Sequence, residues 1–171
     1  MKKRILVLLS CLLSFLLVSC GGSKTAEKAA SGPKDTLVFA QISECKTLDP
    51  QDTTEQYSQR IINVLYDRLV EVDEMTGETI PGLAKSWERI DDNTLLFHLN
   101  ENVKFHNGTP MTPQKVKESI EYTMKQSAHS AKAVKIESIT VDGQNLIIKT
   151  TEPNGSLLSS LTEPAFVIMD T

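Results

Sequence analysis

Apolar and polar residues alternate with two different periods along residues 36–171, which predicts a mixture of strands and helices. Residues 36–42 form a β-type apolar run, and we expect a strand that is buried on both faces. Residues 53–56 match a capping box and predict a helix over residues 54–66. Its apolar face would be formed, at helical spacing, by Tyr57, Ile61, Val64 and Leu65.

Two later stretches have the pattern of antiparallel hairpins. The first runs forward from Trp87, turns at residues 91–93 and returns over residues 94–99. The odd-numbered positions of the return strand are all apolar, so His98 would lie on the face opposite to the core. The second hairpin covers residues 136–150 around an Asp-Gly turn.

A helix is predicted between the two hairpins, and a further apolar run follows them. Thr112 and Pro113 have the form of a helix cap followed by proline at the first helical position, and the apolar spacing continues to about residue 126. Residues 163–171 resemble a core strand that would need a partner, so we expect the sequence to be part of a longer one. The order of these elements is an α+β pattern.

The first residues have the composition of a secretory signal. Three basic residues at positions 2–4 precede an apolar run over residues 5–18, which is shorter than the roughly 20 residues of a membrane-spanning helix. We therefore predict a signal peptide over residues 1–19. The sequence Leu-Val-Ser-Cys at its end looks like the bacterial lipobox, in which Cys20 would carry the lipid anchor. An ordinary signal peptide with a chance cysteine is the alternative.

Composition and cysteine usage restrict the remaining possibilities. Residues 20–35 are small, polar and charged, and they predict a flexible tether before a domain that spans residues 36–171. The net charge of −4 argues against nucleic acid as a partner. Removal of Cys11 and acylation of Cys20 would leave Cys45 as the remaining thiol, so we expect no disulfide. No CxxC or histidine-rich spacing indicates a metal site, and no cofactor is expected.

Residues 103–110 (VKFHNGTP) place a histidine, an amide and a glycine together. A catalytic or metal-binding role would need partner residues, and no nucleophile with a matching base and acid lies nearby in the sequence. The dipeptide Asn107-Gly108 readily takes a positive φ. We therefore interpret the stretch as a turn that connects a strand to the following helix.

Several motifs along the chain occur together, in the same order, in one protein family. They are Leu48-Asp49-Pro50, Tyr66-Asp67-Arg68-Leu69-Val70, Pro81-Gly82-Leu83-Ala84-Lys85-Ser86-Trp87, Phe97-His98-Leu99-Asn100 and the stretch from Val103 to Pro110. With these motifs the chain resembles the bacterial extracellular solute-binding proteins of family 5, which are the dipeptide, oligopeptide and nickel receptors of ABC transporters. The resemblance covers residues 36–171.

Some positions depart from the pattern of this family. Asn100 stands where arginine is usual, and Asn107 stands where aspartate is commoner. Residues 113–115 (Pro-Gln-Lys) replace an alanine and two acids. Lys115 and Lys117 would therefore lie near the positive end of the helix dipole, at an expected cost of a few tenths of a kcal/mol.

The resemblance implies a two-lobed fold of the type II periplasmic-binding-protein class, which closes around its solute by a hinge. Residues 36–171 would supply the first strand of one lobe and the extra subdomain of the family. The implied function is extracytoplasmic: a lipid-anchored receptor on a bacterial membrane that captures di- or oligopeptides for the permease of an ABC importer. A nickel chelate is the alternative solute. An envelope-anchored hydrolase is an alternative of another class, but no GxSxG or HExxH motif supports an enzyme.

The resemblance also suggests where the solute would bind. Glu44, Cys45 and Tyr57 flank the segment that borders the cleft in the family, although Cys45 is equally interpreted as a small buried thiol. His129 lies where nickel-type relatives carry a histidine followed by tryptophan, but Ser130 follows it here, and an exposed loop histidine is the alternative. We propose no catalytic residue.

Overall fold

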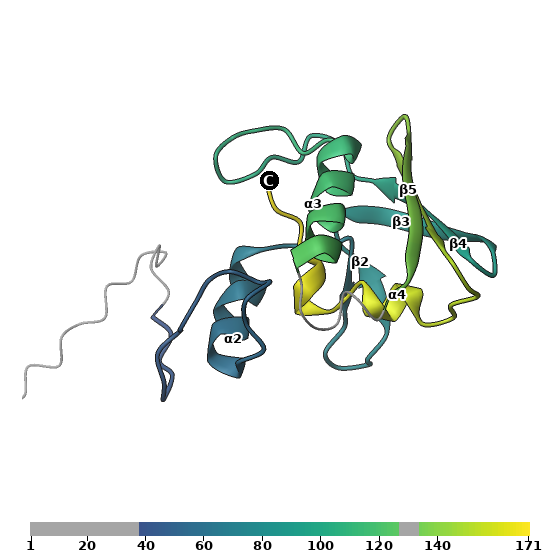
Figure 1. Ribbon diagram of the computed structural model, residues 1–171. Helices are drawn as coiled ribbons and strands as arrows, with labels where there is room; N and C mark the ends of the chain where they lie inside the picture. The colour runs from purple at the N-terminus through teal and green to yellow at the C-terminus, as the bar shows by residue number, and fades with distance from the viewer. Residues whose placement is uncertain (1–37, 127–133) are drawn as a thin grey trace, which may run out of the picture. The chain divides into compact units, whose positions relative to one another are not determined.

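Two antiparallel hairpins pair side by side to make the central sheet of the described chain (Figure 1). The computed structural model describes residues 38–126 and 134–171, of which residues 40–171 form one unit. The strand order is β3 (Ala84–Asp91), β4 (Thr94–Leu99), β6 (Asn145–Thr150) and β5 (Ile136–Asp142), and all neighbours are antiparallel. Both predicted hairpins are confirmed, and the accompanying helices confirm the α+β class.

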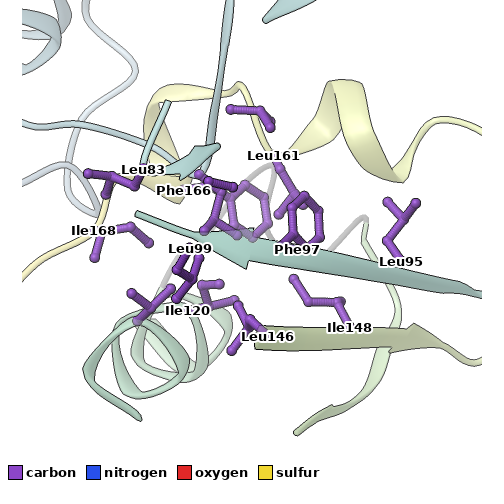
Figure 2. Close-up of a cluster of buried hydrophobic side chains, with 14 of the residues drawn as sticks. Leu83, Leu95, Phe97, Leu99, Ile120, Leu146, Ile148, Leu161, Phe166 and Ile168 are labelled. Carbon is purple, nitrogen blue, oxygen red and sulfur yellow. The ribbon is translucent and has the colours of Figure 1, made fainter. Parts of the chain in front are cut away.

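The core lies on one face of the sheet and is centred on β4. The odd-numbered residues of this strand are buried, as their alternation predicted. Helix α3 (Pro113–Gln126), which the sequence also predicted, packs against β5 and β6 and contributes Ile120 to the core. Figure 2 shows Phe97 in this cluster together with Leu161 and Phe166, which come from the last part of the chain.

The opposite face of the sheet is polar around His98. Nδ1 of His98 lies 2.8 Å from Oδ1 of Asn145 on β6, and Nε2 lies 3.2 Å from Oε1 of Glu88 on β3. His98 therefore connects three strands on the face away from the core. The alternation of apolar and polar residues along β4 predicted that the His98 side chain lies on this face.

Each outer strand of the sheet contains an irregularity in its pairing. The register of β3 against β4 shifts within residues 84–86 and again within residues 89–91. The register of β5 against β6 shifts within residues 136–138. Irregularities of this kind bend a strand and increase its twist. We therefore expect both outer strands to be bent and more strongly twisted than a regular strand.

A short hairpin that the sequence did not predict precedes the sheet. β1 (Val70–Val72) pairs with β2 (Thr79–Pro81), and each strand is too short to show a periodicity. Directly after β2, the chain approaches an earlier segment at Gly82. A Cβ atom at this position would lie 2.6 Å from the carbonyl oxygen of Arg68, so the approach requires glycine.

The helix predicted over residues 54–66 is present as α2 (Gln56–Leu65), but its cap and its buried face differ from the prediction. The cap is Glu55, whose two carboxylate oxygens accept hydrogen bonds from the backbone N–H groups of Tyr57 and Ser58, each at 3.0 Å. The hydroxyl of Thr53 instead accepts the N–H of Glu55 itself at 3.0 Å, so it lies before the helix and leaves the first-turn N–H groups to the Glu55 carboxylate.

The buried face of α2 is formed by Ser58 and Ile62 rather than by the predicted apolar stripe. Val64, which the prediction placed on the buried side, is 75% exposed. The reason is tertiary packing: α2 contacts the 3₁₀ helix η2 (Pro164–Phe166), and Ser58 on the buried face accepts the N–H groups of Lys46 and Thr47.

The predicted strand at the start of the domain is not observed. Residues 38–42 belong to no strand, and Ile42 is 93% exposed. A strand needs neighbours for its N–H and C=O groups. The strands in the described part of the chain pair among themselves and leave residues 38–42 without such a neighbour.

The prediction of a core strand over residues 163–171 is also wrong in its secondary structure. The segment forms η2, which Pro164 begins, and then an extended stretch with a single bridge between Val167 and Arg68. The prediction of burial is correct for Phe166, Val167 and Ile168. The preceding apolar residues form the short helix α4 (Leu157–Ser160).

Replacing Gly82 with alanine should destabilise the protein, because the new Cβ would overlap a backbone oxygen that cannot move independently. We expect Gly82→Ala to lower the free energy of unfolding by about 1–3 kcal/mol. Gly155→Ala is the matched control, since a Cβ there meets no atom within 4 Å. Urea unfolding followed by circular dichroism would measure both variants, and equal losses would contradict the close approach at Gly82.

Candidate functional site

Residues 103–110 form a turn, as predicted. The backbone N–H of Phe105 donates to the carbonyl of Thr109 at 2.9 Å, and the N–H of Gly108 donates to the carbonyl of Phe105 at 2.8 Å. Gly108 has a φ of 84°, which favours glycine. His106 is exposed at the tip. The stretch before the turn pairs only through the bridge between Lys104 and Pro110, so it is not the core strand that we expected to end there.

A hollow of about 340 Å³ lies beside this turn. It is lined by residues 65–67 at the end of α2, by residues 103–107, by residues 168–170, and by Leu83 and Met111. The side chains of Leu83, Met111 and Ile168 are buried and give the hollow an apolar floor. A concave site with an apolar floor and a few polar groups at its rim is the usual form of a small-molecule site.

The rim of the hollow carries a carboxylate with two partners. Asp170 pairs with Nζ of Lys115 and accepts a hydrogen bond from Nδ2 of Asn107 at 2.8 Å. These bonds, that of Lys115 first, hold the pKa of the Asp170 carboxyl below its usual range. Lys115 and Asn107 are two of the positions at which the chain departs from the family pattern. The charge of Lys115, near the positive end of the helix dipole, therefore has a specific acidic partner in Asp170.

The structure brings two of the predicted solute-site residues close to one another. The Sγ of Cys45 lies 3.2 Å from the carbonyl oxygen of Thr47 and 3.6 Å from Oγ of Ser58, either of which can accept its S–H, so Cys45 is held beside the first turn of α2. Tyr57 precedes Ser58 and is half-buried, with the guanidinium carbon of Arg60 5.8 Å from its ring centroid. Their role in solute binding remains a prediction.

The other predicted residues are not part of this arrangement. Glu44 is exposed beside Cys45. His129 and Cys20 lie outside the described residues. None of Glu44, Cys45 and Tyr57 lines the hollow, so the predicted site and the hollow are different surfaces.

Two residues that sequence reasoning did not select organise these surfaces. The hydroxyl of Ser58 is buried and accepts hydrogen bonds from the N–H groups of Lys46 and Thr47 at 3.0 and 3.4 Å, in addition to that of Cys45. Arg68 is only 6% exposed, and its guanidinium binds Glu71, Asn63 and the carbonyl of Glu163. For Arg68, the sequence offered one indication: an arginine directly before the apolar pair Leu69-Val70 of a family motif. A serine on a helix carries no such signal.

Residues 38–126 and 134–171 contain neither a membrane-crossing helix nor a metal-binding cluster of side chains. No helix there has both the length and the apolar character needed to cross a bilayer. No group of three or more His, Cys, Asp and Glu side chains within the same ranges is arranged to hold a metal ion.

The sequence and the fold are similar to known proteins. Residues 78–171 match the model of the bacterial extracellular solute-binding proteins, family 5. The chain is 41% identical over 95 residues to the nickel-binding protein NikA of Staphylococcus aureus, covering 56% of this chain and 19% of that protein. It is 35% identical over 109 residues to the probable D,D-dipeptide-binding periplasmic protein DdpA of Escherichia coli, covering 61% of this chain and 21% of that protein.

Solved structures give the same result at the level of the fold. A crystal structure of Staphylococcus aureus NikA in complex with Ni(L-His)₂ matches 63% of this chain and 23% of its own, with a TM-score of 0.59 and 38% identity. A nickel ABC transporter structure from Bacillus halodurans matches 75% of this chain and 27% of its own, with a TM-score of 0.68 and 32% identity. The chain therefore spans about a fifth to a quarter of the length of these relatives.

Replacing Ser58 with alanine should release the segment that carries Cys45. The variant loses the hydroxyl that accepts hydrogen bonds from two backbone N–H groups and from the thiol of Cys45. Each such hydrogen bond contributes about 0.5–1.5 kcal/mol to stability. We expect Cys45 of Ser58→Ala to be alkylated by iodoacetamide roughly two- to tenfold faster. Peptide mass spectrometry follows this cysteine separately from Cys11 and Cys20. The exposed Ser138→Ala is the control, and an equal rate in all three proteins would contradict the attachment.

Proposed function

Because the chain belongs to the bacterial extracellular solute-binding proteins of family 5, we propose that it serves solute capture for an ABC importer, with a di- or oligopeptide as the solute. The observation that carries the proposal is the family match over residues 78–171, which include the whole four-stranded sheet, α3 and most of the residues that line the hollow. The members of this family are binding proteins, so the proposed role requires no catalytic group.

The physical basis of such a role is a cleft that closes around the solute. The structural neighbours are two-lobed periplasmic binding proteins, and a hinge between lobes lets both walls contact the ligand. Each wall of the cleft must keep its shape while the lobes move, because the closed form has to fit the solute. The four-stranded sheet with its continuous buried cluster provides a rigid support of this kind.

A nickel chelate is the second candidate solute. The observation that favours it is the similarity to NikA of Staphylococcus aureus, whose crystal structure contains nickel bound to L-histidine. A chelate of this type presents amino-acid carboxylates on its surface. A receptor would therefore recognise it with hydrogen bonds and charges, as it would recognise a peptide. The two candidates differ mainly in the shape and charge of the solute.

The proposal includes the location of the protein. Residues 1–19 would direct export, Cys20 would attach the mature protein to the membrane by lipid, and residues 20–35 would be the tether. Several acyl chains bind a bilayer stably where a single chain binds it marginally. A receptor held in this way stays close to the permease that receives its solute.

An uptake experiment distinguishes the two solutes. Deleting the gene should abolish most accumulation of a radiolabelled tripeptide and leave ⁶³Ni accumulation unchanged, and restoring the gene should restore peptide uptake. Loss of ⁶³Ni accumulation alone would support the nickel chelate instead. Normal accumulation of both solutes would contradict a role in either transport process.

The lipid anchor is tested separately. Growth with tritiated palmitate should label the protein, and Cys20→Ser should abolish the label and release the protein from the membrane fraction. Cys45→Ser is the matched control and should remain labelled. Labelling that persists in Cys20→Ser would show that the sequence resembling a lipobox is not the acylation site.

A further inference from the structure

Residues 167–170 form a short strap that runs along one side of the hollow. The N–H of Ile168 donates to the carbonyl of Asp67 at 2.8 Å. On the other side of the strap, the buried hydroxyl of Ser119 on α3 accepts the N–H of Met169 at 2.8 Å and donates to the carbonyl of Val167 at 3.4 Å. Val167 and Ile168 are buried, whereas Met169 and Asp170 are not. The first half of the strap is therefore held by packing and the second half by polar contacts.

The polar contacts converge on the carboxylate of Asp170. Lys115, from the first turns of α3, pairs with one oxygen, and Asn107, from the turn, donates to the other. Lys115 also places its Nζ 5.9 Å from the ring centroid of Phe105, which is within the range of a cation–π contact. One lysine consequently contacts the turn and the strap at the same time.

We propose that Asp170, Lys115 and Asn107 form an electrostatic latch, which holds residues 169–170 against the turn and so sets the width of the hollow. The latch joins the strap to two groups that are far from it in the sequence: Asp170 is 55 positions from Lys115 and 63 positions from Asn107. The Met169, Asp170 and Asn107 side chains all line the hollow, so opening the latch removes part of its wall.

The charges around the hollow agree with a latch that works by ionic attraction. The lowered pKa of the Asp170 carboxyl means that the folded protein favours its ionised form. The stabilisation is therefore complete above the ordinary pKa of an aspartate and is lost as the pH falls through the lowered value. The other ionisable groups that line the hollow are Tyr66, Asp67, Lys104 and His106. The paired groups are partly exposed, so salt should weaken the latch.

The amide proton of Met169 is the direct reporter of the latch, because its hydrogen bond to Ser119 persists only while the strap is in place. Hydrogen–deuterium exchange of the whole chain should show this amide exchanging roughly two- to fivefold faster in Lys115→Met than in the unmodified protein, the range expected for an exposed ion pair. Asp170→Asn should give the same effect, and the double variant should add little to either. Raising sodium chloride from 50 mM to 1 M should accelerate exchange in the unmodified protein and not in the variants.

Lys117→Met is the matched control, since Lys117 lies on the same helix and pairs with Glu121 at 3.7 Å. It should leave the exchange of Met169 unchanged. Reversing the pair, with Lys115→Asp and Asp170→Lys together, should restore slow exchange and its dependence on salt. The proposal is overturned if Lys115→Met behaves like Lys117→Met, or if salt has no effect on Met169 in the unmodified protein. The salt measurement needs no variant and decides the matter even if a variant fails to fold.

Discussion

Three consecutive carbonyl groups, at residues 67–69, hold the described unit together. Those of Arg68 and Leu69 accept the N–H groups of Leu83 and Ala84, where the sheet begins, and that of Asp67 accepts the N–H of Ile168, near the last described residue. One extended segment thus contacts both the start of the sheet and the strap near the end of the described chain. Buried carbonyl groups need such partners. The rest of the sheet, and both edges of the hollow, depend on this arrangement.

The side chain of Arg68 makes that segment rigid. Its guanidinium reaches α2 through Asn63 and η2 through the carbonyl of Glu163, while Glu71 neutralises its charge. A buried charge is tolerated only when it is paired and its donors are satisfied. The motif around Arg68 is part of the family resemblance. The contacts of Arg68 give the motif an architectural role, because they join elements that are distant in the sequence.

The sequence predicted the elements whose pattern is local. Both hairpins, α3 and the turn at Asn107-Gly108 follow from alternation, helical spacing and a positive φ, and all are present. The errors occur where distant partners decide: α2 packs against η2 and against residues 46–47, and residues 38–42 have no neighbouring strand in the described part of the chain. The hollow and the environment of Asp170 were not predicted, because they join three segments whose proximity no local pattern encodes. The predicted solute contacts at Glu44, Cys45 and Tyr57 remain predictions.

The irregular pairing of the two outer strands has a consequence for how molecules of this protein meet one another. An open sheet ends in rows of backbone groups that can pair with a strand from a second molecule, and flat, regular edges do this most readily. Here the register shifts in β3 and β5 interrupt both rows. A strand from a second molecule that paired with β3 or β5 would meet an interruption of the regular hydrogen-bond pattern within a few residues. The same irregularities that bend the sheet therefore favour a protein that stays dispersed at high local concentration.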